Sequence, residues 1–265
     1  MTSKGFAAVA AALVMNLAGA AAAAEEPAPP AKTPPAAKSS GVPPDGWRHE
    51  IALYVAATGM SGQAAAGGVE ADVDLPFSEI LDQLEAAGMV AYRAEKGRGA
   101  IFANVLFMGL GGTKDLRAGG TAEADFDETL FEVDGAWRFA KHLEVYGGAR
   151  LVSLEARLEL RPVLGGTLEG DGSKTWVDPL VGLRYATPLG KHWTFVFRAD
   201  AGGFGIGSDF AWQALAHFDW RISKHWGAAF GYVILDIDYD DGEGSDFFLY
   251  DIAAQGPLAA ATFSF

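Results

Sequence analysis

Large apolar residues alternate with small, polar or charged residues through most of the chain after Trp47, and no other feature limits the fold as strongly. Successive side chains of an extended strand point to opposite faces, so this period of two predicts β-strands. The segments 192–201, 210–220 and 226–234 each carry an apolar face with aromatic residues near its ends. A band of outward apolar side chains between two aromatic girdles is typical of strands that close into a membrane barrel.

The chain also ends on a segment of this kind. In residues 247–265 the apolar side chains of Pro257, Ala261, Phe263 and Phe265 fall on one face, and Phe265 is the last residue. Chain ends usually fray in water unless neighbouring elements hold them. An aromatic strand at the very end therefore indicates that 247–265 is the strand that closes the barrel.

The first 46 residues have a different character. Lys4 precedes an apolar run over 6–17, and a series of alanines ends at Ala24. This is the pattern of a cleaved secretory signal peptide, and the apolar run is too short for a transmembrane helix. Residues 25–46 are rich in proline and alanine, which predicts an extended or disordered tether, with a partner-docking segment as the alternative. The expected division is a signal peptide at 1–24, a periplasmic tether at 25–46 and a barrel at 47–265.

Composition narrows the classes of function. The chain has no cysteine, which excludes disulfides and lipid acylation, and its formal charge of −14 argues against nucleic acid as a partner. The histidines lie at or near the short turns with no serine placed beside them as a nucleophile, so we expect no enzyme. The acidic stretch 236–246 lacks the ligand spacing of a calcium loop, so we interpret it as a solvated acidic tip, with weak divalent-cation binding beside lipopolysaccharide as the alternative. We expect no metal site and no cofactor.

Turn signals separate the alternating segments and predict an all-β, antiparallel, up-and-down transmembrane barrel of about ten strands, with eight or twelve also compatible. Short turns alternate with longer polar or glycine-rich connections. In bacterial barrels the short turns face the periplasm and the long loops face outward, which places the tether and the C-terminus in the periplasm. The longer connections are expected near 61–87, 112–124, 160–174, 203–209 and 240–246. The expected strands are 47–60, 88–95, 99–111, 124–139, 143–159, 175–187, 192–204, 209–222, 225–239 and 247–265.

Short glycine-rich and aromatic motifs recur in these strands, at 147–150, 178–184, 203–213, 231–239 and 262–265. They resemble the OmpA-like transmembrane superfamily of small outer-membrane barrels from Gram-negative bacteria. The resemblance covers about 47–265 and implies the porin-like barrel architecture, with Phe263 and Phe265 forming part of the signal that the barrel-assembly machinery recognises. The sequence shows no peptidoglycan-binding domain after the barrel, which argues against a role in cell-wall anchoring.

The inward faces of the expected strands collect charges of both signs. Alternation keeps these groups away from lipid, where a charge near the midplane costs about 2–4 kcal/mol. In a narrow barrel such groups can pair across the lumen and fill it. We favour this salt-bridged plug over an ion-selective constriction, and the near balance of charge predicts no strong ion preference. The expected network consists of Glu132, Asp134, Arg138, Arg150, Asp178, Arg184, Arg198 and Asp200.

One strand, 225–239, differs because its inward face carries no polar group. Such a stripe of small and apolar residues either makes room for bulky neighbours or holds a lipid or fatty chain. The inward residues are Gly227, Ala229, Gly231, Val233 and Leu235.

The first long connection contains a candidate helix near 77–85, with Ser78 as a possible N-cap and Glu79 in its first turn. Its apolar residues recur at helical spacing and form one face that will not remain in water. We expect this face to pack on the rim or in the mouth of the barrel, or else to contact another protomer or the membrane surface. The residues of the face are Phe77, Ile80, Leu81 and Leu84.

These features lead to one main hypothesis and two alternatives. The first is an integral outer-membrane barrel with a structural or interaction role, a largely plugged lumen and the capacity to form a homo-oligomer. The alternatives are a narrow diffusion channel and a barrel that binds a lipid or small ligand. The expected partners are outer-membrane lipids and lipopolysaccharide, the barrel-assembly machinery and a second copy of the chain.

Overall fold

The computed structural model describes residues 46–66, 69–115, 120–162 and 167–265. The expected signal peptide and nearly all of the expected tether lie outside these described residues. Within the described ranges, no helix has both the length and the apolar character needed to cross a membrane.

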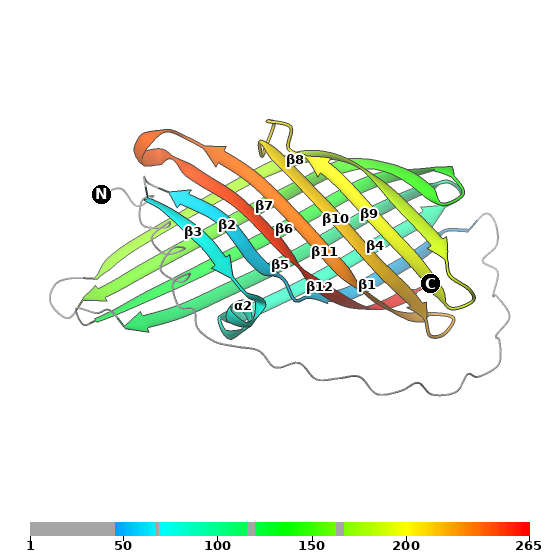
Figure 1. The fold of residues 1–265 in the computed structure, drawn as a ribbon, viewed down its shortest axis with the longest axis horizontal. Helices are drawn as coiled ribbons and strands as arrows, with labels where there is room; N and C mark the ends of the chain where they lie inside the picture. The colour runs from blue at the N-terminus through cyan, green and yellow to red at the C-terminus, as the bar shows by residue number, and fades with distance from the viewer. Residues whose placement is uncertain (1–45, 67–68, 116–119, 163–166) are drawn as a thin grey trace.

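The described residues form a closed antiparallel barrel of ten strands (Figure 1). Each strand pairs with its neighbours in the ring, and pairing between the first and last strands completes it. The predictions of an all-β barrel, of ten strands and of a closing C-terminal strand are confirmed. The ring consists of β1 (Arg48–Ala56), β4 (Leu84–Lys96), β5 (Gly99–Asp115), β6 (Gly120–Ala140), β7 (Leu143–Pro162), β8 (Leu168–Pro188), β9 (Trp193–Gly202), β10 (Phe210–Arg221), β11 (Trp226–Asp241) and β12 (Phe248–Ser264).

Two further strands lie outside this ring. β2 (Gly59–Ala66) pairs with the first half of β12, and β3 (Val69–Leu75) pairs with β2. The expectation of an irregular connection over 61–87 is therefore wrong for most of this stretch. Its residues are mostly small, and they form strands because β12 offers them a pairing edge far away in the sequence.

A short helix, α2 (Phe77–Asp82), follows β3, and a single 3₁₀ turn, η1 (Gly244–Asp246), joins β11 to β12. The predicted loop helix is present, but it ends at Asp82, and Leu84 already belongs to β4. Pro76, rather than Ser78, occupies the N-cap position. The fixed φ of proline suits the entry into a helix, so Ser78 lies inside the first turn.

β1 and β2 share one register along β12 and are separated only at Ala57 and Thr58. Ala56 faces Leu258, and Gly59 faces Gln255. Pro257 lies opposite the break and has no N–H to donate, so its carbonyl accepts from the Ala57 amide at 2.8 Å without a return bond. The Ala57 carbonyl approaches Gly256 instead, where a Cβ would lie 2.1 Å away. Pro257 and Gly256 thus explain the interruption.

The two ends of the barrel differ. Short turns and the C-terminus lie at one end, which we call the tight-turn end, and the other connections lie at the far end (Figure 1). β6 and β8 have 21 residues each. A membrane-crossing strand needs about 9–11 residues, so these strands extend well beyond a single crossing. The long loops predicted near 112–124 and 160–174 are mostly strand, which is a correction to the sequence analysis.

The outer surface changes polarity along these strands. Nearer the tight-turn end it is apolar and aromatic, whereas towards the far end the outward residues are largely acidic. The exposed apolar residues include Ile51, Leu53, Phe131, Trp137, Leu183, Trp193, Phe197, Phe218, Trp226 and Phe230. The exposed residues towards the far end include Asp72, Asp74, Asp127, Glu155, Arg157, Asp171 and Asp251.

The interior has the opposite arrangement. Nearer the tight-turn end it holds ionised side chains, and towards the far end it holds an apolar cluster to which α2 contributes Ile80. The far-end half is therefore built like a water-soluble β-protein, with an apolar core and a polar surface. We call this group the far-end apolar cluster; it comprises Met60, Val73, Leu75, Ile80, Leu110, Val152, Leu154, Trp176, Ala211, Ile237, Tyr239, Tyr250 and Ile252.

Candidate functional site

Two arginines and three carboxylates meet deep in the lumen. Arg150 donates to Glu132 at 2.7 Å and to Asp200 at 2.8 Å. Arg198 donates to Asp134 at 2.6 Å and also pairs with Glu132. These residues come from β6, β7 and β9, where alternation turns all of them inward. We call them the central ion cluster; five of the eight charged residues predicted for the lumen belong to it.

Aromatic rings hold Arg198 in this cluster. The guanidinium carbon lies 4.4 Å from the ring centroid of Phe102 and 4.3 Å from that of Tyr146. The Tyr146 hydroxyl accepts from Arg198 Nε at 2.7 Å and donates to Asp200 at 2.9 Å. A guanidinium that stacks on rings and donates within its own plane has little freedom to move, so these contacts hold Arg198 in one arrangement.

A second group of charges lies nearer the tight-turn end. Glu144 accepts from Arg93 at 2.7 Å, from Arg138 at 2.8 Å and from Arg184 at 3.4 Å. Glu95 accepts from Arg93 at 3.3 Å and from Arg138 at 3.4 Å. We call these five residues the lower ion cluster. It contains Arg138 and Arg184 from the predicted network, but these two do not bond with the central ion cluster.

Four residues of the lumen were not predicted from the sequence: Arg93, Glu95, Glu144 and Tyr146. Glu144 and Tyr146 share the inward parity of Arg150, so the pattern of β7 could have identified them. Arg93 and Glu95 lie on β4, whose alternation is weak, and only the pairing of β4 with β1 shows which face is inward.

Asp178 bonds with residues outside both ion clusters, although Arg150 lies opposite it in the pairing of β7 with β8. Its carboxylate accepts from the Ser208 amide at 2.6 Å and from Trp176 Nε1 at 3.3 Å. Ser208 belongs to the turn between β9 and β10, in which Phe204 has a φ of 54°. Asp178 therefore anchors a turn that folds against the lumen.

The predicted apolar face of the loop helix is divided. Ile80 is buried in the far-end apolar cluster, and Leu84 packs against the cluster at the start of β4. Phe77 and Leu81 are exposed, at 38% and 53% of their surface. The helix thus covers the interior with one side and leaves two apolar side chains outside.

The predicted terminal aromatics lie at the seam of the barrel. His49 and Phe265 exchange backbone hydrogen bonds of 3.0 and 2.9 Å, and their rings stack at 5.2 Å between centroids. The ring of Phe263 lies 4.9 Å from that of Trp226. Both phenylalanines therefore contribute to the contacts that join β12 to its neighbours.

A cavity of about 190 Å³ lies in the lumen between the two ion clusters and the β10–β12 wall. Central-cluster residues such as Glu132 and Arg198 border it, and Glu50 and Asp219 line it nearer the tight-turn end. No group of three or more acidic or histidine side chains within the described ranges is arranged to hold a metal ion.

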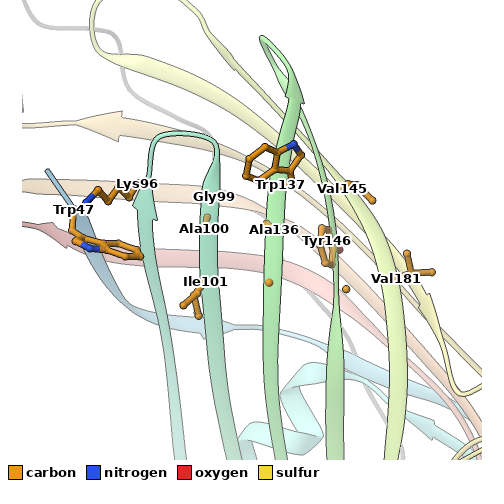
Figure 2. A pocket seen from close by; sticks show the side chains of 12 residues that line it. Trp47, Lys96, Gly99, Ala100, Ile101, Ala136, Trp137, Val145, Tyr146 and Val181 are labelled. Atoms are coloured by element: carbon orange, nitrogen blue, oxygen red, sulfur yellow. The ribbon is translucent and has the colours of Figure 1, made fainter. Parts of the chain in front are cut away.

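The outer wall carries a separate hollow of about 580 Å³ near the tight-turn end (Figure 2). Gly135 and Gly147 face each other across β6 and β7, and neither has a side chain to fill the wall. Trp47 and Trp137 border the hollow. Tryptophans bordering an apolar recess are typical of the aromatic girdle at a membrane interface.

No known protein-family model matches the chain, and no curated protein sequence matches it. Among solved structures it is similar to Ail, the attachment invasion locus protein of Yersinia pestis, with 12% identity, 83% of this chain and 99% of that chain covered, and a TM-score of 0.38. It is also similar to the translocator domain of NalP from Neisseria meningitidis, with 13% identity, 82% of this chain and 88% of that chain covered, and a TM-score of 0.37. A third similar structure is the toluene transporter TodX from Pseudomonas putida, with 11% identity, 84% of this chain and 90% of that chain covered, and a TM-score of 0.33. These values are too low to assign a family or a function.

The central ion cluster yields a stability prediction. Arg150→Met leaves the buried carboxylates Glu132 and Asp200 without one of their two arginine partners, and breaking a buried pair in this way costs about 3–5 kcal/mol. We expect a loss of that size in the free energy of unfolding, measured by urea titration of the refolded protein with tryptophan fluorescence. Arg161→Met is the matched control, because the Arg161 side chain is 56% exposed, and it should change stability by less than about 0.5 kcal/mol. Equal effects of both variants would contradict the prediction.

Proposed function

We propose that this chain is an integral outer-membrane β-barrel with a structural or interaction role and a closed lumen, and that it is not an enzyme. The central ion cluster is the main support for the proposal, because five charged side chains from three strands bond to one another inside the lumen. Beyond it, towards the far end, the far-end apolar cluster fills the interior. Because the central ion cluster and the far-end apolar cluster follow one another along the lumen, this narrow barrel has no wide path for water.

The membrane location is supported by the outer surface. The apolar and aromatic wall near the tight-turn end would be unstable in water, whereas a bilayer requires such a wall. Strand pairing around the ring also satisfies the backbone groups that lipid cannot. We place the tight-turn end in the periplasm and the acidic far end outside the cell, next to lipopolysaccharide. Membership of the OmpA-like superfamily remains a proposal that rests on the motifs.

The closed lumen can be tested by conductance. We expect the refolded protein to give no stable unit steps in planar bilayers, because the paired charges and the apolar layer exclude a continuous water column. Heat-modifiable migration of the same preparation in gels checks that the barrel is folded. Stable, reproducible unit steps from the folded protein would favour a narrow diffusion channel instead.

Assembly can be tested at the C-terminus. Deleting Phe265 removes both backbone bonds to His49 and the stacked ring, and we propose that it also removes part of the signal read by the assembly machinery. We expect less heat-modifiable barrel in isolated outer membranes. Phe218→Ala, which removes an exposed aromatic near the tight-turn end of β10, a strand that does not pair with β12, is the control and should assemble normally. Normal levels after deletion would contradict the proposal.

Self-association is proposed to use the exposed side of α2. Phe77 and Leu81 project from the helix, whereas Ile80 beside them is buried. The double variant Phe77→Ser and Leu81→Ser should shift detergent-extracted protein from oligomer to monomer in native mass spectrometry, because it removes apolar contact area. Leu189→Ser, at an exposed leucine in a tight turn, is the control. An unchanged oligomer in the double variant, or a monomeric starting protein, would eliminate this interface.

A further inference from the structure

The lumen cavity has the size of a small-molecule site. Its volume is about 190 Å³, somewhat more than the roughly 150 Å³ of an engineered cavity that binds benzene. The central ion cluster borders it towards the far end, so a ligand would enter from the tight-turn end.

One wall of the cavity is apolar. It consists of small and aliphatic side chains from neighbouring strands β11, β12 and β1, and it includes part of the stripe that the sequence showed on 225–239. Ala229 and Ala260 face each other across β11 and β12, and Ala260 faces Tyr54 across β12 and β1. The wall offers apolar contact, since its side chains carry no hydrogen-bonding group; they are Ala52, Ala229, Val233, Leu258 and Ala260.

The opposite wall presents an incompletely used arginine. Within the described part of the chain, the only ion pair of Arg184 is its 3.4 Å contact with Glu144, which two closer guanidiniums already occupy. A guanidinium has five N–H donors, so most of those on Arg184 remain for a ligand. The Arg184 side chain is 21% exposed and lines the cavity. On this side of the lumen, four guanidiniums share two carboxylates: Arg48, Arg93, Arg138 and Arg184 bond with Glu95 and Glu144.

The other acids that line the cavity have partners. Glu50 accepts from the Ser264 hydroxyl at 3.0 Å, and Asp219 lies 2.9 Å from His217 and also attracts Arg184 electrostatically. Glu132 and Asp134 are bound by the arginines of the central ion cluster. The unused donors of Arg184, rather than an excess of positive charge, therefore mark the place for an anionic group.

We propose that the cavity binds a small organic monoanion with a compact apolar body, of the size of an aromatic carboxylate. The carboxylate accepts hydrogen bonds from Arg184, and the body lies against the wall formed by Ala229, Val233 and Leu258. A planar carboxylate matches the guanidinium fork, and burying the apolar body supplies the remaining affinity. The site rests on the closed lumen of the proposed function, because an open pore would not retain the ligand.

Calorimetric titration of the refolded full chain tests this site, with benzoate, its neutral counterpart benzamide and inorganic phosphate as probes. We expect benzoate to bind at least about tenfold more tightly than benzamide, a ratio equivalent to about 1.4 kcal/mol. Phosphate should also bind more weakly than benzoate, because it cannot use the apolar wall. Arg184→Met should weaken benzoate binding by a similar factor, and Arg161→Met should leave it unchanged. Ala229→Phe, which fills the cavity from the apolar side, should weaken all benzoate binding without removing a charge.

Each of the opposite results would contradict the proposal. Absence of benzoate binding to the folded protein, unchanged binding in Arg184→Met, or equal affinity for benzamide would show that Arg184 does not hold an anion there. Phosphate binding as tight as benzoate binding would show that the apolar wall contributes nothing. Conductance of the same preparation separates the two proposals. If the protein gives no unit steps and does not bind benzoate, only the ligand site is contradicted. If it gives unit steps, the closed lumen is contradicted.

Discussion

The alternation of side chains across a closed sheet is the constraint on which the whole structure depends. Ring closure pairs the backbone of the ten strands, so side chains alone decide what faces the lumen and what faces the surroundings. Because the period is two, each strand must separate its polar from its apolar residues, and a slip of one residue would reverse both faces. In this chain the polar residues face the lumen near the tight-turn end, whereas the apolar residues face it towards the far end.

Near the tight-turn end the polar residues face inward, and their charge has to be compensated within the lumen. Arg150, Glu132 and Asp200 are almost completely buried, and each is stable there only through the others. The two ion clusters solve this problem differently. The central ion cluster is dense, whereas the lower ion cluster leaves Arg184 with one long bond. That difference is the basis for proposing closure of the lumen by the central ion cluster and a ligand site beside the lower one.

The sequence predicted the ring of strands, the closing strand and the charges of the central ion cluster, because all three follow from local parity. It did not predict the far-end half. There the acids face outward and the apolar residues inward, so residues 112–115 and 120–124 have the composition of a polar loop although they belong to strands β5 and β6. The β2–β3 hairpin was missed because its small residues carry no strong pattern and its partner, β12, lies at the other end of the chain. Arg93 and Glu95 were missed for a similar reason, since the weakly patterned β4 acquires a defined face only through pairing with β1.

The reversal of polarity along the barrel also determines how a ligand can approach the lumen. From the far end, a molecule would have to disrupt an apolar core that includes the stacked rings of Trp176 and Tyr239, whose centroids are 4.0 Å apart, and then the central ion cluster. From the tight-turn end it meets the partly buried side chains of the lower ion cluster. In the proposed function the far-end layers block passage. The same layers would give the cavity beneath them the closed end that a binding site needs, because Glu132 and Arg198 of the central ion cluster border it.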